Sequence, residues 1–271
     1  MAASRTACLR SRRLRYSVGL SLSLDVARST IRRSQGRTGC AAQNAQNLLV
    51  RVVGIEVSTF LWPYGPLLGE RGVVVIYAVE ADRRWILFDT GIGEAHPDLA
   101  EYETTTRPMV AALTEAAVPV DKITAIVNCH LHFDHCGQNS ALPGIPIYAQ
   151  RAEWQAAHEP DYTIAEWVDF DGADYHLING GHHLLPNVSI LATPGHTPGS
   201  QALVIDSPDE RVILAGQACF SPEEWSGGGD GEGRMHAWSE EVYDASIATM
   251  KALDPDVVWF AHARDPWHRR S

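Results

Sequence analysis

The sequence lacks a disulfide framework and an apolar run of membrane length, and in its main body basic residues are far outnumbered by acidic ones. Its five cysteines are an odd number spread along 271 residues, a pattern that does not predict paired disulfides. We therefore expect reduced thiols in a reducing compartment. Val18–Leu24, the apolar run near the start, is far too short to span a bilayer, and no other segment is a candidate.

Charge divides the chain into two unequal parts. Residues 1–47 hold nine arginines against one acidic residue, Asp25, so they carry +8 and residues 48–271 carry −19, in a chain of net charge −11. A body this acidic lacks the basic surface on which nucleic-acid binding depends. We expect a small-molecule partner, no nucleic acid and no membrane, and the composition leaves the oligomeric state open.

The first 47 residues differ from the rest because they are rich in Arg and Ser and cannot bury a core. We expect a disordered extension, or one that arises from an upstream start site. A transit peptide has a similar composition, and a secretory signal stays open, although no small-residue cleavage site follows the apolar run. We expect one domain over residues 48–271, long enough for a sizeable core. Its expected location is the cytoplasm unless the extension directs it to an organelle or to secretion.

Residues 1–47 are expected to be dispensable for folding and activity, since they offer the core nothing to pack. A chain that starts at Leu48 should stay soluble and keep the melting temperature and turnover of the full chain. Insolubility or lost activity after this deletion would contradict the expectation.

A cluster of ligand-type side chains lies in Asn128–Gly137. It offers three imidazoles and a carboxylate within six residues, from His130, His132, Asp134 and His135. Both group types suit Zn²⁺ and similar metals. The apolar run Ile123–Val127 predicts a buried strand, and binding residues tend to gather on loops after such strands. Cys129 and Cys136 flank the cluster as potential further ligands, although we expect them to pack beside it.

The spacing within the cluster favours two metal positions. If the chain stays extended, side chains two residues apart point to the same side, so His130, His132 and Asp134 would face one way. His135 must then come from a turn, which Gly137 helps to form.

This segment resembles the metal-binding loop of the metallo-β-lactamase superfamily of hydrolases. The other landmarks of that superfamily occur in their usual order: Asp89-Thr90-Gly91 before the loop, then His196 in a Thr-Pro-Gly-His-Thr-Pro-Gly-Ser run, then His262. The resemblance covers about residues 48–268. It implies an α+β fold, an αββα four-layer sandwich with two sheets face to face, helices outside and a metal cleft at one edge.

The resemblance also implies the roles of the site residues. Metal one would be held by His130, His132 and His196, and metal two by Asp134, His135 and His262. One or two Zn²⁺ ions per chain would then supply hydroxide at neutral pH, because a bound metal lowers the pKa of water toward ~7. Asp134 would also relay a proton to the leaving oxygen, and Asp89 would orient the loop from behind.

A further match lies in Tyr148–Trp154, which is similar to the Ala-Gln-Arg-x-Glu segment of the N-acyl-homoserine lactonase family. It implies a zinc-dependent, quorum-quenching hydrolase that opens the ester bond of an N-acyl homoserine lactone by metal-bound hydroxide. Phe133 and Phe220 would contact the substrate. A thioesterase of the glyoxalase II type is the alternative hydrolase.

Two residues depart from the family pattern. Members normally have Gly-Asp where this chain has Gly216-Gln217, and that Asp bridges the two metals. Gln217 is therefore expected to be a weak metal ligand. Lactonases place a substrate-contacting Tyr three positions later, where this chain has Phe220. These changes keep open a metal-binding protein with little hydrolytic activity.

Periodicity and turn signals predict the remaining elements. Helices are expected over residues 106–118, 151–158 and 239–253, and the aromatic-rich residues 159–181 are expected to form a loop. Its aromatic side chains either line a pocket or pack beneath the loop. His182 and His183 are expected in a solvated turn. Five isolated histidines are expected outside the site: His96, His158, His176, His236 and His268.

Overall fold

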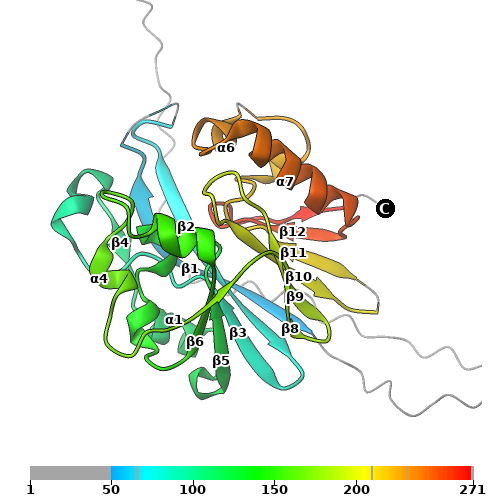
Figure 1. Ribbon diagram of the computed structural model, residues 1–271, viewed down its shortest axis with the longest axis horizontal. Coiled ribbons are helices and arrows are strands. Elements are labelled where there is room, and N and C mark those ends of the chain that lie inside the picture. The colour runs from blue at the N-terminus through cyan, green and yellow to red at the C-terminus, as the bar shows by residue number, and fades with distance from the viewer. Residues whose placement is uncertain (1–49, 64, 66, 209, 230, 270–271) are drawn as a thin grey trace, which may run out of the picture.

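The computed structural model describes residues 50–63, 65, 67–208, 210–229 and 231–269, so the expected extension, residues 1–47, lies outside the described residues. Two sheets dominate the fold (Figure 1). The seven-stranded sheet has the order β4-β1-β2-β3-β5-β6-β7, and the six-stranded sheet has the order β13-β12-β11-β10-β9-β8.

The strands of the first sheet are β1 (Arg51–Leu61), β2 (Arg71–Ala81), β3 (Arg84–Phe88), β4 (Thr105–Thr106), β5 (Ile123–Val127), β6 (Pro146–Gln150) and β7 (Asp174–Ile178). Those of the second sheet are β8 (His182–Leu185), β9 (Val188–Ala192), β10 (Gln201–Asp206), β11 (Arg211–Leu214), β12 (Val257–Trp259) and β13 (Trp267–His268). The α-helices are α1 (Met109–Glu115), α2 (Phe133–Cys136), α3 (Arg151–Ala156), α4 (Ala165–Val168), α5 (Pro222–Trp225), α6 (Glu232–Met235) and α7 (Glu240–Ala252). Three 3-10 turns cover Pro97–Tyr102, Val120–Lys122 and Asn139–Ala141.

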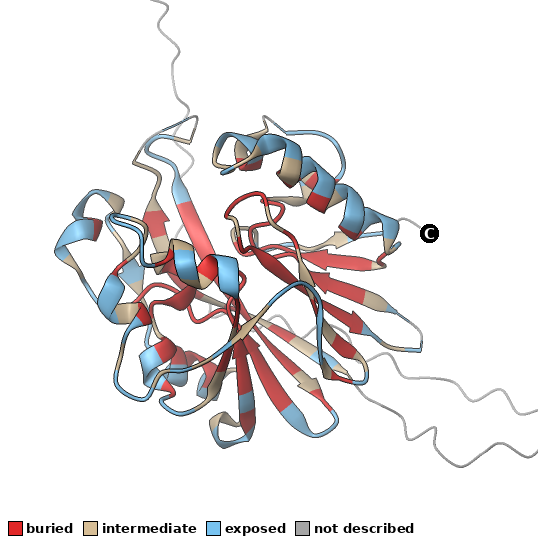
Figure 2. Cartoon of the chain, in the orientation of Figure 1, coloured by how far each residue is buried: buried red, intermediate tan, exposed pale blue. Residues whose placement is uncertain are grey.

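Strand β2 shows why the sheets stack in layers. Its side chains alternate between two apolar faces, because successive residues of a strand point in opposite directions. One face, with Val75 and Tyr77, packs in the cluster shared with the second sheet. The other face, with Ile76, packs in the cluster that includes Met109 and Leu113 of α1. Buried residues accordingly run along the central strands in Figure 2.

The outer face of the second sheet completes the sandwich. Residues of β10, β11 and β12 pack against Met250 of α7, which lies alongside these strands in Figure 1. Ser239 caps α7 by accepting a hydrogen bond from Val242 N–H, as its position before the apolar pattern predicts. The expected αββα sandwich is therefore confirmed. Within the described residues, no helix is long and apolar enough to cross a membrane.

Two local expectations were wrong. Residues 159–181 contain α4 and β7, and β7 pairs in parallel with β6, so sheet pairing overrides the polar, loop-like composition. Their aromatic side chains pack against the apolar clusters, as Tyr175 does on Trp154 with ring centroids 4.4 Å apart. His182 and His183 are exposed as expected, but they lie in β8 because they pair with β9.

Candidate metal centre

Five strand ends deliver the predicted site residues to one place. The loop after β5 carries His130 to His135, and the loops after β9 and β12 carry His196 and His262. Asp89 and Gln217 follow β3 and β11. Backbone hydrogen bonds join these loops, since Asp89 N–H donates to Val127 O and Ala261 N–H donates to Gly216 O.

Gly216 permits one of these close approaches. Its φ of +58° lies in the left-handed region, and a Cβ there would lie 2.4 Å from Cys129 Cβ. A glycine is therefore required where the Gln217 loop crosses the histidine loop.

The first ligand set consists of three imidazoles. His130 Nε2 lies 2.9 Å from His132 Nδ1, which lies 3.3 Å from His196 Nε2. Burial lowers the pKa of all three histidines, and their mutual proximity lowers that of His130 and His196 further. Neutral imidazoles whose ring nitrogens converge fit a divalent metal ion, because a metal needs the unprotonated nitrogen.

The second set joins a carboxylate to two imidazoles. Asp134 Oδ2 lies 3.2 Å from His135 Nε2 and 3.4 Å from His262 Nε2. The His262 tautomer is set by its other nitrogen, Nδ1, which donates to Val73 O at 2.8 Å. His262 Nε2 is buried without a hydrogen-bond partner and faces a carboxylate oxygen. Two acceptors that face each other fit a cation between them.

Asp89 supports this second set from behind. Its Oδ1 accepts from Cys129 N–H at 2.7 Å, and its Oδ2 lies 3.0 Å from His135 Nδ1. A His135 Nδ1–H that donates to Asp89 leaves Nε2 to face Asp134. Burial lowers the pKa of His135, but Asp134 and then Cys129 and Asp89 raise it well above its usual value. The second set therefore attracts positive charge, as a proton or as a metal ion.

Gln217 lies beside the second set. Its side chain is 6% exposed, and its Oε1 lies 3.0 Å from His135 Nε2. The rings of His130 and His135 are 4.1 Å apart, so the two sets adjoin. The structure thus brings together all seven residues that the sequence predicted as ligands, including Gln217.

The local conformation differs from the extended run expected from spacing. Strand β5 ends at Val127, and Phe133–Cys136 form α2, so Asp134 and His135 both come from a helical turn. Asn128 Nδ2 donates to His135 O at 3.0 Å and helps to hold this turn. The expectation that Asp134 faces the same side as His130 and His132, which assumed an extended chain, was therefore wrong.

The cysteines remain close to the centre. Cys129 Sγ lies 3.1 Å from His130 Nδ1 and 3.2 Å from His135 Nδ1, a third group of ligand types. Burial, followed by the charge of Asp89, raises the pKa of this thiol. A thiol that keeps its proton is a poor ligand, so packing fits Cys129 better. Cys136 is also buried, and its Sγ contacts Leu131 O and His132 O.

An aromatic wall adjoins His262, and sequence reasoning missed two of its members. Trp62 and Phe220 lie 6.0 Å and 5.5 Å from the His262 ring between centroids. His236, expected to lie apart from the site, stacks on Trp62 at 5.4 Å and on Phe220 at 5.9 Å. The two members that were missed, Trp62 and His236, lie in loops without periodicity, so no local pattern could reveal them.

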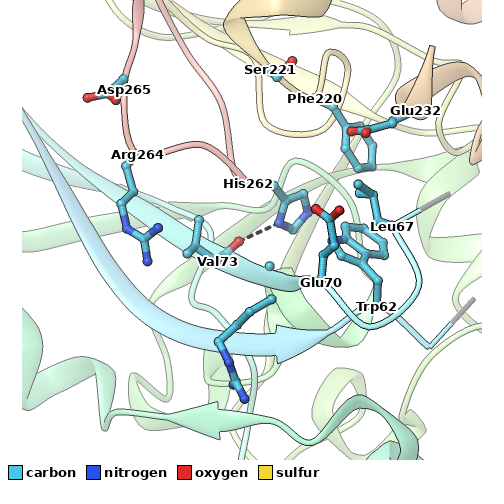
Figure 3. Close-up of a pocket in the computed structure, with 12 residues that line it drawn as sticks. Trp62, Leu67, Glu70, Val73, Phe220, Ser221, Glu232, His262, Arg264 and Asp265 are labelled. Atoms are coloured by element: carbon cyan, nitrogen blue, oxygen red, sulfur yellow. Dashed lines mark hydrogen bonds between the residues drawn. The ribbon is translucent and has the colours of Figure 1, made fainter. Parts of the chain in front are cut away.

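Trp62, Phe220 and His262 border a cavity of about 370 Å³. Figure 3 shows Trp62, Phe220 and His262 beside it, with charged groups such as Arg264 farther along the wall. Arg264 pairs with Glu56, with Nε and Oε2 at 2.7 Å. Phe133 instead packs edge-on against Tyr102, with centroids 4.9 Å apart.

Comparisons with known proteins agree with this geometry. The sequence profile described as the metallo-beta-lactamase superfamily matches residues 69–262. An N-acyl homoserine lactonase from Bacillus sp is 28% identical over 207 residues, which cover 69% of this chain and 79% of that protein. A second N-acyl homoserine lactonase, from Bacillus cereus, is 29% identical over 203 residues with the same coverage.

A solved structure is similar over most of its length. It is an N-acyl homoserine lactone hydrolase with the product N-hexanoyl-L-homoserine at its catalytic metal centre. It matches this chain with a TM-score of 0.65 and 26% identity, covering 78% of this chain and 92% of its own.

Proposed function

Because the chain belongs to the metallo-β-lactamase superfamily, we propose that it is a metal-dependent hydrolase that opens the ester bond of a lactone. We propose an N-acyl homoserine lactone as the substrate. The observation that carries the proposal is the convergence of six ligand-type side chains, from three strand ends, into two adjoining sets. The similarity to lactonases over most of the chain supports the choice of substrate.

Zn²⁺ is the proposed metal, because imidazole and carboxylate ligands suit it. The first ion would be held by His130, His132 and His196, and the second by Asp134, His135 and His262, with Gln217 beside it. Bound there, the metal would lower the pKa of a water toward ~7 and polarise the carbonyl under attack.

Asp134 is the residue that we propose moves a proton. Burial raises its pKa, but His135 and then His262 and His132 more than offset this and hold the pKa below its usual range. The carboxylate is therefore ionised at neutral pH and can accept a proton. Delivered to the ring oxygen as the ester bond breaks, that proton turns the leaving group into a neutral hydroxyl.

The aromatic wall provides the proposed substrate surface. Trp62 and Phe220 border the cavity beside His262, so an apolar acyl group can pack there while the lactone carbonyl faces the metal ligands. Phe133 is proposed as a further contact from α2. Phe220 has no hydroxyl, so it can exclude water and pack against the substrate but cannot donate a hydrogen bond.

Turnover of a lactone panel beside a thioester panel tests the proposed function. Purified, zinc-loaded protein is expected to open N-acyl homoserine lactones to the ring-opened acid and to release one titratable proton per turnover. The His196→Ala variant, purified in the same way, controls for contaminating hydrolases. Turnover of thioesters alone would favour the glyoxalase II type of reaction. Bound metal without turnover of either panel would favour the weakly hydrolytic alternative.

A further inference from the structure

Glu153 is a buried carboxylate that the proposed reaction does not use. It lies in the first turn of α3 and is 1% exposed. Its Oε1 accepts from Leu131 N–H at 2.8 Å and from the Tyr162 hydroxyl at 2.6 Å. Its Oε2 accepts from the Thr197 hydroxyl at 2.6 Å and from Gly199 N–H at 3.2 Å. Four donors therefore occupy the roughly four acceptor positions that an ionised carboxylate offers.

The donors come from the two loops that carry the first imidazole set. Leu131 lies between His130 and His132, and Thr197 follows His196 directly. The Tyr162 ring also contacts the His132 ring, with centroids 4.7 Å apart. The Glu153 carboxylate therefore accepts hydrogen bonds from both imidazole loops. It also binds the Tyr162 hydroxyl, and the Tyr162 ring packs against the His132 ring.

The distance between α3 and the His196 loop is fixed by direct backbone contact. A Cβ on Gly199 would lie 2.3 Å from Glu153 N, so the loop lies against the helix with no side chain between them. Ser200 extends the network, since its Oγ accepts from Thr197 N–H at 3.0 Å. The close contact between Gly199 and Glu153 fixes the position of the carboxylate relative to the His196 loop.

Charge gives Glu153 a second effect. The first set contains three neutral imidazoles and no carboxylate, and Gln217 adds no charge nearby. A divalent cation there would gain from a buried negative charge behind its ligands. We propose that Glu153 is a positioning residue for the first metal, which orients its imidazole loops and supplies that charge. This inference rests on the metal site of the proposed function.

The Glu153→Gln variant tests the inference. Each carboxylate oxygen accepts one backbone N–H, so either orientation of the amide places its NH₂ against a backbone donor. Zn²⁺ affinity, measured by competition with a chromophoric chelator at constant pH, is expected to fall ~10–100-fold at the first site, which is expected to be the tighter because Gln217 supplies no bridging charge to the second. The visible absorption of the Co²⁺-loaded protein should change as the imidazoles lose their fixed orientation.

Leu113→Ala is the matched control, because it opens a cavity under α1 without touching this network. It should lower the melting temperature and leave Zn²⁺ affinity unchanged. If Glu153→Gln does not fold, Tyr162→Phe and Thr197→Val each remove one donor and should each weaken Zn²⁺ binding. Affinities within twofold of wild type in Glu153→Gln, or in both donor variants, would overturn the inference. A wild type that binds Zn²⁺ but opens no lactone would refute the proposed function alone, since affinity is measured without substrate.

Discussion

Replacing His130 or His196 with alanine is expected to remove the metal of the first set and hydrolysis together. Each imidazole is buried and supplies one of the three ring nitrogens that converge in the first set. Two remaining nitrogens would fill only two of the four positions of a tetrahedral zinc ion. Loss of a single transition-state donor costs ~10²–10³ in rate. Loss of the metal also removes the source of the nucleophile, so we expect a larger decrease.

The measurement is metal content after dialysis, followed by lactone turnover on the same samples. His183→Ala is the matched control, because His183 is an exposed histidine of β8 outside both ligand sets. It should retain wild-type metal and turnover. Melting temperatures with and without Zn²⁺ separate lost binding from lost folding, since a ligand that binds only the folded state raises its stability. Unchanged metal content in both His130→Ala and His196→Ala would rule out the first ligand set.

The resemblance to the superfamily predicted the layers of the fold, and the apolar pattern predicted individual strands. Ile123–Val127 is a strand with the predicted bounds, since it is a short apolar run that ends at turn residues. Prediction failed where long-range pairing decides the structure. Residues 174–178 become β7 only because β6 offers a partner, and no local signal reports that partner.

The candidate site likewise has features that the sequence could predict and features that it could not. Ligand-type residues concentrated in one loop and single histidines after later strands could be predicted, because metal binding restricts residue type and spacing. The place of Asp134 in the second ligand set could not be predicted from the spacing, since it depends on α2 replacing an extended backbone. His236 and Glu153 act through contacts with distant loops, so only the folded arrangement reveals them.

Gln217→Asp is expected to tighten the second metal relative to the first. A bridging carboxylate places a negative charge between two dications, and its two oxygens can each bind one ion. Gln217 has one carbonyl oxygen, no charge, and an NH₂ group that a cation repels. Its Oε1 already lies 3.0 Å from His135 Nε2, so the position adjoins the second set. In the wild type, the repulsion between the two ions is poorly neutralised, and one site should fill at a lower Zn²⁺ concentration than the other.

A Zn²⁺ titration of wild type beside Gln217→Asp checks this, with lactone turnover followed in both. We expect the second dissociation constant to fall at least about tenfold, or ~1.4 kcal/mol. Gln217→Asn has the length of Asp without its charge, so it should not tighten the site. In chelator, Gln217→Asp should melt below the wild type, because a second buried carboxylate then lies near Asp134. Two tight, equivalent metals in the wild type, unchanged by Gln217→Asp, would show that a water or hydroxide bridge suffices and that Gln217 only ligates weakly.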